Sequence, residues 1–220
     1  MINAGALVAA SLVHGADRSE RVERIVEQLR IYAGNPSLHV DEDTLDAELV
    51  ANDHNLGLSY IMRSLGMIHG DIEEHLAVYL SICSVSVTAR DLATMGATLA
   101  HGGINPLTGQ RALTPAGVRD VVTVMSMCGM YTAAGQWAYD VGIPAKSSVS
   151  GRILATIPDH VGAGSFSPGL DVHGNSVRGI NICRDLSARF GLHAFAAPGE
   201  ARLGRAVPAG PHPELSEPSS

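Results

Sequence analysis

The chain has 220 residues and a mass of 23.0 kDa, which suits one ordinary domain with a core of its own. Its 22 acidic and 15 basic residues give a formal net charge of −7, which argues against a nucleic-acid-binding protein, because such proteins neutralise phosphates with basic side chains. Hydrophobic residues make up 45% and charged residues 17%, which excludes a disordered chain, and the 4% of aromatic residues predicts an aliphatic core.

Residues 1–13 are apolar, and no basic residue precedes Arg18, so the charged start of a signal peptide is missing. This apolar run has no polar lead-in, and we therefore expect the sequence to start in the middle of a domain. An amphipathic helix is predicted over 18–32, where apolar residues recur every three or four positions opposite charged ones. Asp17 is placed to cap its start.

The next part of the chain is predicted to be mostly helical. A polar loop with six acidic residues, 37–53, comes first. Thr88 and Asp91 have the spacing of a capping box, and Thr114 followed by Pro115 is a second strong helix start. The predicted helices are 53–65, 71–84, 88–100, 114–128 and 131–141. The expected inner face of the fourth consists of Val118, Val121, Val122 and Met125.

The pattern changes after Pro144, where short apolar runs over 152–157 and 161–166 are bounded by Gly, Pro and Asp and predict strands. We expect these strands to pair antiparallel, with a helix over 174–190 packed on their sheet. Residues 196–220 contain five prolines and predict a disordered tail, which leaves 1–195 as the domain. Helices followed by a strand pair and a helix indicate an α+β fold.

Three cysteines, Cys83, Cys128 and Cys183, lie far apart in apolar segments without a CxxC pair. We interpret them as reduced core residues of a cytosolic protein, with no metal site. Residues 121–139 carry no charge and are long enough to span a bilayer, but their Thr, Ser, Gln and Gly residues and the lack of basic flanks favour a buried helical segment of a soluble protein.

The chain has a single lysine, Lys146, which precedes Ser147 in a segment of small residues. On a strand edge these groups can hold a carboxylate and present a backbone N–H to an oxyanion, although a solvated turn explains the pattern equally well. Tyr79 and Tyr131 lie in apolar regions where their hydroxyl groups need partners, and a core position is the alternative for both.

Several segments of the chain resemble one known family. The most specific are TLAHGGINPLTG, from Thr98 to Gly109, and NSVRG, from Asn175 to Gly179. Further matches are Ile2–Ala6, Cys83–Val85, Val87–Thr88, Asp91–Ala93, Cys128–Tyr131, Ala133–Gly135, Pro144–Ser147 and Phe166–Pro168. Over about residues 1–190 the chain resembles the serine-dependent glutaminases, which share the fold of penicillin-binding proteins and serine β-lactamases. The resemblance implies a β-lactamase/transpeptidase-like α+β fold, a helix-rich body packed on an antiparallel sheet that lacks its N-terminal strands here and so has an open edge.

The implied activity is hydrolysis of L-glutamine to L-glutamate and ammonia through a serine acyl-enzyme. By resemblance, Asn3 contacts the amino-acid end of the substrate, and Glu48 pairs with its α-ammonium group. We expect a buried carboxylate in that role. Asn55, seven residues after Glu48, matches a second polar contact. From the residues alone, a solvated surface position is the favoured explanation for both Glu48 and Asn55.

At the amide end, Tyr79 and Tyr131 match two tyrosines around the scissile bond, and Tyr131 is expected to help move the proton of the nucleophile. Lys146 and Ser147 match the strand motif of the family and complete the expected catalytic set. Val149 matches the residue whose backbone N–H helps to form the oxyanion hole.

The chain also departs from the family pattern. His54 replaces the usual Arg before Asn55, and Ser148, Ser150 and Arg152 intervene where glycines continue the strand motif. The family nucleophile lies in a Ser-x-x-Lys motif upstream of the Ile2–Ala6 segment, and no such motif occurs in these 220 residues, because Ile143 stands three positions before the single lysine.

We therefore expect a glutaminase whose N-terminal part is absent here, and no hydrolysis from residues 1–220 alone. The alternative is a catalytically inactive remnant that binds amino acids or partner subunits. Another penicillin-recognising serine hydrolase is disfavoured by the glutamine-specific residues. The resemblance implies homodimers or homotetramers without a cofactor, and we expect a cytoplasmic protein that binds neither nucleic acid nor membranes.

Overall fold

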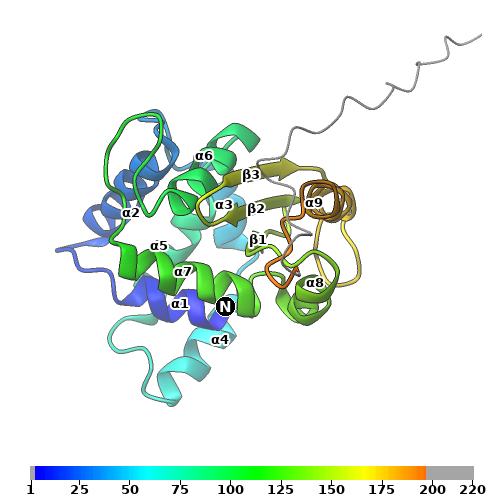
Figure 1. Cartoon of the computed structure of the whole chain (residues 1–220). Helices are drawn as coiled ribbons and strands as arrows, with labels where there is room; N and C mark the ends of the chain where they lie inside the picture. Colours follow the sequence, from blue (N-terminus) through cyan, green and yellow to red (C-terminus); the bar gives the residue numbers. More distant parts are fainter. Residues whose placement is uncertain (1–2, 197–220) are drawn as a thin grey trace, which may run out of the picture.

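A computed structural model describes residues 3–196, and the tail predicted over 196–220 lies almost wholly outside that range (Figure 1). The elements in chain order are α1 (Asn3–Ser11), α2 (Arg18–Ala33), α3 (Glu42–Val50), α4 (Asp53–Ser64), α5 (Ile72–Cys83), α6 (Ala89–Ala100), α7 (Pro115–Cys128), η1 (Tyr131–Ala133), α8 (Ala134–Asp140), β1 (Ala145–Ser147), β2 (Arg152–Ile157), β3 (Val161–Phe166) and α9 (Val177–Phe190). The mixture of helices with one small antiparallel sheet confirms the α+β prediction.

The sheet of the described residues has three antiparallel strands in the order β1-β2-β3. Arg152 pairs with Phe166 and Ile157 with Val161, so β2 and β3 form a hairpin with the predicted bounds. The hairpin tip contains Asp159 with a φ of 62°, a left-handed conformation that Asp tolerates better than most residues. The prediction of an antiparallel pair is therefore confirmed.

Helices cover both faces of the sheet (Figure 1). On one face α6 approaches the backbone of β3 so closely that a Cβ on Gly162 would lie 1.9 Å from the Ala97 nitrogen. On the other face Ile153 and Ala155 of β2 form a core with Cys183 of α9 and Trp137 of α8. The helix predicted over 174–190 does pack on the sheet, but it begins at Val177 because Ser176 caps it.

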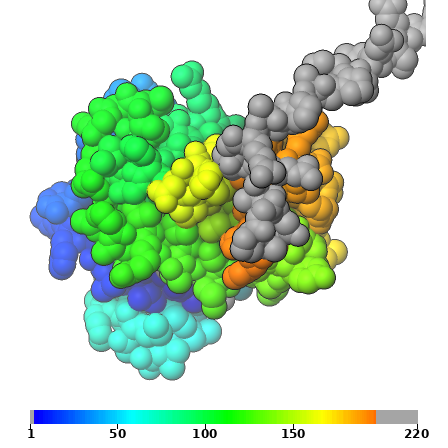
Figure 2. All heavy atoms as spheres, in the orientation of Figure 1, coloured from blue at the N-terminus to red at the C-terminus, as the bar shows by residue number. Residues whose placement is uncertain are grey.

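A second core joins α1, α3, α4 and α5 around Leu7, Leu76 and Leu80. The predicted loop over 37–53 contains α3, which Asp41 caps by accepting from the backbone nitrogen of Thr44. Only Leu45 of this helix is buried, so the sequence lacks the apolar residues at every third or fourth position that would predict a helix here. The segment around α4 projects from the body of the molecule as the cyan lobe of Figure 2.

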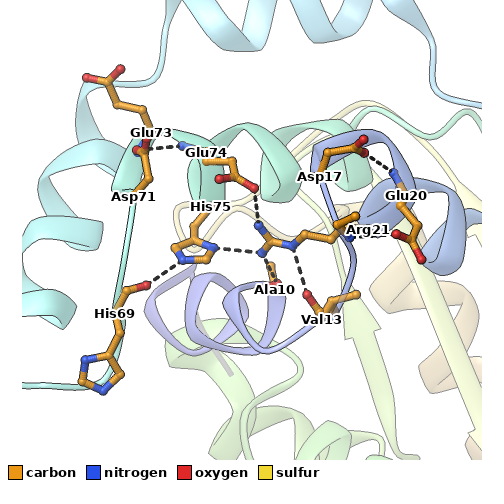
Figure 3. A network of polar contacts seen from close by, with 11 residues as sticks. Ala10, Val13, Asp17, Glu20, Arg21, His69, Asp71, Glu73, Glu74 and His75 are labelled. Atoms are coloured by element: carbon orange, nitrogen blue, oxygen red, sulfur yellow. Dashed lines mark hydrogen bonds and ion pairs between the residues drawn. The ribbon is translucent and has the colours of Figure 1, made fainter.

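The buried guanidinium group of Arg21 ties α1 and α5 to α2 (Figure 3). Its Nε donates to the carbonyl of Val13 at 3.0 Å and its Nη2 to the carbonyl of Ala10 at 3.1 Å, so it satisfies two groups at the carboxyl end of α1. Nη1 bonds Glu74 at 3.1 Å, and Nη2 lies 2.8 Å from Nδ1 of His75.

Other details differ from the predictions. Only Met125 of the expected inner face of α7 is buried, and Val121 is exposed. The segment predicted as a helix over 131–141 begins with a 3₁₀ turn, and the regular helix starts only at Ala134, because the left-handed φ of 54° at Tyr131 is incompatible with an α-helix. Cys183 is buried as expected, whereas Cys83 is exposed, so the core interpretation was wrong for Cys83. Within residues 3–196, none of the helices has both the length and the apolar character needed to cross a bilayer.

Candidate active site

Lys146 lies on β1, at one edge of the sheet. This strand pairs with β2 on one side and contacts the turn at Gly129 on the other. The Ser147 nitrogen donates to the Gly129 carbonyl at 3.1 Å, which fixes the strand against that turn. Lys146 points to the opposite side from its buried neighbours Ala145 and Ser147. Its Nζ lies 4.4 Å from the centre of the Tyr131 ring and donates to the carbonyl of Ser147. Burial lowers the pKa of Lys146 to about 8, so a large fraction of this amine is neutral in mildly alkaline solution.

Tyr131 brings its hydroxyl group to the same strand. The hydroxyl lies 3.5 Å from the Ser147 carbonyl. Burial raises the pKa of Tyr131, while a hydrogen bond with the backbone of Val149 acts in the opposite direction. Lys146, Tyr131 and the backbone of Val149 therefore meet at the end of β1.

Tyr79 and Cys83 lie one turn apart on α5 and interact through their side chains. Burial raises the pKa of Tyr79, and the nearby Cys83, Tyr131 and Glu48 raise it further. Although the Cys83 thiol is exposed to solvent, the protein groups around it desolvate the thiolate and raise its pKa, against the effects of Tyr79 and Lys146, which lower it. The structure thus brings Tyr79, Tyr131, Glu48 and Lys146 within electrostatic reach of one thiol, from four separate elements.

The remaining predicted residues form a pair on neighbouring helices. The Asn3 side chain at the start of α1 donates to Oδ1 of Asn55 in α4 at 2.9 Å. Both helices pack on α5, which carries Tyr79. Glu48 is exposed on α3, so the expectation of a buried carboxylate is wrong for this structure.

Two further features were not foreseen in the sequence. Cys83 was assigned to the core, although its position four residues after Tyr79 on a helix places both on one face. The buried Ser147 hydroxyl donates to Oδ1 of Asn175 at 2.5 Å, so it is bonded inside the protein instead of facing solvent. Ser148 and Ser150 are the two serines that depart from the family pattern. Their hydroxyl oxygens lie 2.8 Å apart and form a hydrogen bond beside the exposed Val149.

A separate apolar cavity of about 240 Å³ lies between α9 and the sheet. It is lined by Ile143, Ala155, Ile157, Val161, Ala163, Cys183, Leu186, Phe190 and Leu192. None of the predicted site residues lines it. Within the described residues no group of three or more His, Cys, Asp or Glu side chains is arranged to hold a metal ion.

The helical body, the small antiparallel sheet and the lysine on its edge strand define an α+β domain of the β-lactamase-like class. Comparison with known proteins gives the family. The family model described as Glutaminase matches residues 1–195, and the chain belongs to the glutaminase family.

Similar proteins agree with this assignment. A glutaminase of Trichormus variabilis is 45% identical over 195 residues, which cover 89% of this chain and 58% of that protein. A glutaminase of Clavibacter michiganensis subsp. michiganensis is 47% identical over 199 residues, covering 90% of this chain and 61% of that protein. The chain therefore spans about three fifths of the length of these relatives.

Solved structures give the same result at the level of the fold. The crystal structure of Mglu in its native form superposes with a TM-score of 0.85 at 49% identity, covering 90% of this chain and 48% of that one. Mglu in its tris and glutamate form gives a TM-score of 0.85 at 49% identity over 89% of this chain and 44% of that one.

Proposed function

We propose that this chain supplies the substrate-binding part of a glutaminase, which hydrolyses L-glutamine to L-glutamate and ammonia through a serine acyl-enzyme. The observation that carries the proposal is the meeting of Lys146, the Tyr131 hydroxyl and the Val149 backbone at one strand end, with Glu48 and Tyr79 close by. The family membership of the chain supports the same reaction.

The two ends of glutamine require different partners. The carboxylate of Glu48 suits the α-ammonium group, and Asn3 and Asn55 offer amide groups to the amino-acid end. At the other end, the backbone N–H of Val149 suits the oxyanion that develops on the side-chain carbonyl during attack. Tyr131 and Lys146 lie where they can transfer the proton of a nucleophile, and the lowered pKa of Lys146 allows it to accept one.

The nucleophile of the proposed reaction is not among these 220 residues, because the single lysine is not part of a Ser-x-x-Lys motif. Ser147 is a poor substitute, since its hydroxyl is buried and bonded to Asn175. We therefore assign the chain substrate binding, and we assign hydrolysis to the enzyme that also contains the motif. The alternative is an inactive relative that only binds amino acids.

Calorimetric titration of the 220-residue chain with L-glutamine and L-glutamate tests the proposal. Glu48→Gln should weaken binding at least about tenfold, because charge-assisted hydrogen bonds contribute about 1.5–3 kcal/mol. Asp46→Asn is the matched control, since it removes an exposed acid from the other side of the same helix, and it should change the affinity less than about twofold. Equal effects of the two substitutions, or no binding by the wild type, would reject the assignment.

The same samples test whether the chain hydrolyses L-glutamine by itself. Binding without ammonia release is expected from the chain alone, and ammonia above the blank would show that the nucleophile lies within it. The resemblance also leads us to propose that the protein is cytoplasmic and forms a homodimer or homotetramer. Light scattering after gel filtration measures the oligomeric state directly.

A further inference from the structure

A fully buried asparagine, Asn175, bridges the two segments that carry the candidate catalytic groups. Its Oδ1 accepts the Ser147 hydroxyl at 2.5 Å, and its Nδ2 donates to the Met130 carbonyl at 3.4 Å. Both Asn175 and Ser147 are almost inaccessible to water, at 0% and 2% exposed. One amide side chain thus satisfies a hydroxyl on β1 and a carbonyl in the turn before η1.

The backbone around Asn175 is itself held in place. Oδ1 of Asp171 accepts from the backbone nitrogens of His173 and Asn175, both at 2.9 Å, and the Asp171 nitrogen donates to the Asn175 carbonyl at 2.8 Å. Ser176, the next residue, caps α9. A second contact joins this loop to η1, because the hydroxyl oxygen of Thr132 lies 3.0 Å from Nδ1 of His173. The amide of Asn175 therefore projects from a rigid loop.

The two groups that Asn175 joins are each adjacent to a candidate catalytic residue. Met130 precedes Tyr131, whose φ of 54° is costly for a residue with a side chain and requires support from its surroundings. Ser147 follows Lys146 on β1, and its carbonyl is the group that both Lys146 and Tyr131 approach. Any shift between these two segments changes the distance between the amine and the phenol.

We propose that Asn175 is a positioning residue of the site, which holds Tyr131 and Lys146 in their mutual arrangement by joining Met130 to Ser147. This inference rests on the proposed function. It also gives Ser147 a role as an anchor, since the single proton of its hydroxyl is directed at Asn175. Asparagine is suited to the position because one planar side chain supplies both a donor and an acceptor.

The single lysine of the chain allows a direct test. In protein labelled with [ε-¹³C]lysine, Lys146 gives one NMR signal whose titration and response to L-glutamate report on the site. Asn175→Ala removes both bonds, and the near-isosteric Asn175→Asp keeps an acceptor for Ser147 but loses the donor to Met130. Asn105→Ala is the matched control, because Asn105 is also 0% exposed and its Nδ2 bonds the carbonyls of Ile31 and Tyr32, in another part of the fold.

We expect Asn175→Ala to raise the midpoint of the Lys146 titration by at least about half a pH unit, because a loosened site admits water. The dissociation constant for L-glutamate should rise at least about tenfold, and Asn175→Asp should change both quantities in the same direction. Asn105→Ala should lower the melting temperature but leave both quantities near wild type.

The possible results test the positioning role of Asn175 separately from the proposed function of the chain. An unchanged Lys146 titration in both Asn175 variants, or an equal change in Asn105→Ala, would overturn the positioning role. If Asn175→Ala does not fold, Ser147→Ala decides the question, because it removes the hydroxyl that Asn175 holds without placing a new charge near Lys146. A wild-type signal that does not respond to L-glutamate would contradict the proposed function, and the comparison of titrations would still test the role of Asn175.

Discussion

The amine of Lys146 lies 4.4 Å from the centre of the Tyr131 ring, in a setting where burial lowers its pKa to about 8. The charged form of the amine is therefore disfavoured in the folded chain. This relationship makes the stability of the chain depend on pH in a way that a single substitution can reveal.

The first prediction concerns Lys146→Met. Between about pH 8 and pH 10.5 the unfolded chain still binds the proton that folded Lys146 has released, so the free energy of unfolding of the wild type should rise with pH relative to the variant. A pKa lowered from 10.5 to about 8 corresponds to a rise of about 3 kcal/mol over this window. Urea unfolding at several pH values measures the difference, and parallel curves would contradict the prediction.

The second prediction concerns the close contact of α6 with β3. A Cβ at position 162 would lie 1.9 Å from the Ala97 nitrogen and 2.3 Å from the Gly96 carbonyl carbon, both backbone atoms that cannot move aside alone. Gly162→Ala should therefore lower the free energy of unfolding by at least about 2 kcal/mol. Gly57→Ala is the control, since a Cβ there meets no atom within 4 Å in the middle of α4, and it should stabilise the chain by up to about 1 kcal/mol.

Some helices and strands could be predicted from the sequence and others could not, for physical reasons. The bounds of β2 and β3 were correct because Gly, Pro and Asp border both apolar runs, and α6 was recognised from the Thr88–Asp91 capping box that the structure confirms. The helix α3 was missed because it buries only Leu45. Buried polar partners such as Asn175 and Ser147 depend on tertiary packing, which no local pattern reports.

The third prediction concerns the three thiols. Cys183 is on the buried face of α9 and its pKa is raised to about 11, so a disulfide reagent should modify it last and only when the chain opens. The pKa of Cys83 is also raised, but its thiol is exposed to the reagent, so it should react at least about tenfold faster than Cys183. Mass spectrometry of the labelled chain gives the order, and Cys83→Ser should remove the fastest phase. Slower labelling of Cys83 with L-glutamine present would support its place beside Tyr79.

The last prediction concerns Arg21, which is only 4% exposed and bonds two carbonyls at the end of α1. Nε2 of His75 donates to the His69 carbonyl, so its Nδ1 is the acceptor that faces the guanidinium (Figure 3). Arg21→Met would leave the Val13 carbonyl without its donor, the Ala10 carbonyl with only the Val13 nitrogen at 3.3 Å, and Glu74 without its ion pair, and it should cost about 2–4 kcal/mol of the free energy of unfolding.

Arg24→Met is the control for that experiment, because Arg24 is exposed and its ion pair is with the partly exposed Glu20, so its loss should cost less than about 1 kcal/mol. Hydrogen exchange should accelerate first in α1 of the Arg21 variant, since its carboxyl end loses its anchor. Because Asn3 begins the same helix and bonds Asn55, the affinity for L-glutamine should fall as well. Equal stability losses in the two variants, or unchanged exchange in α1, would show that Arg21 does not hold this helix in place.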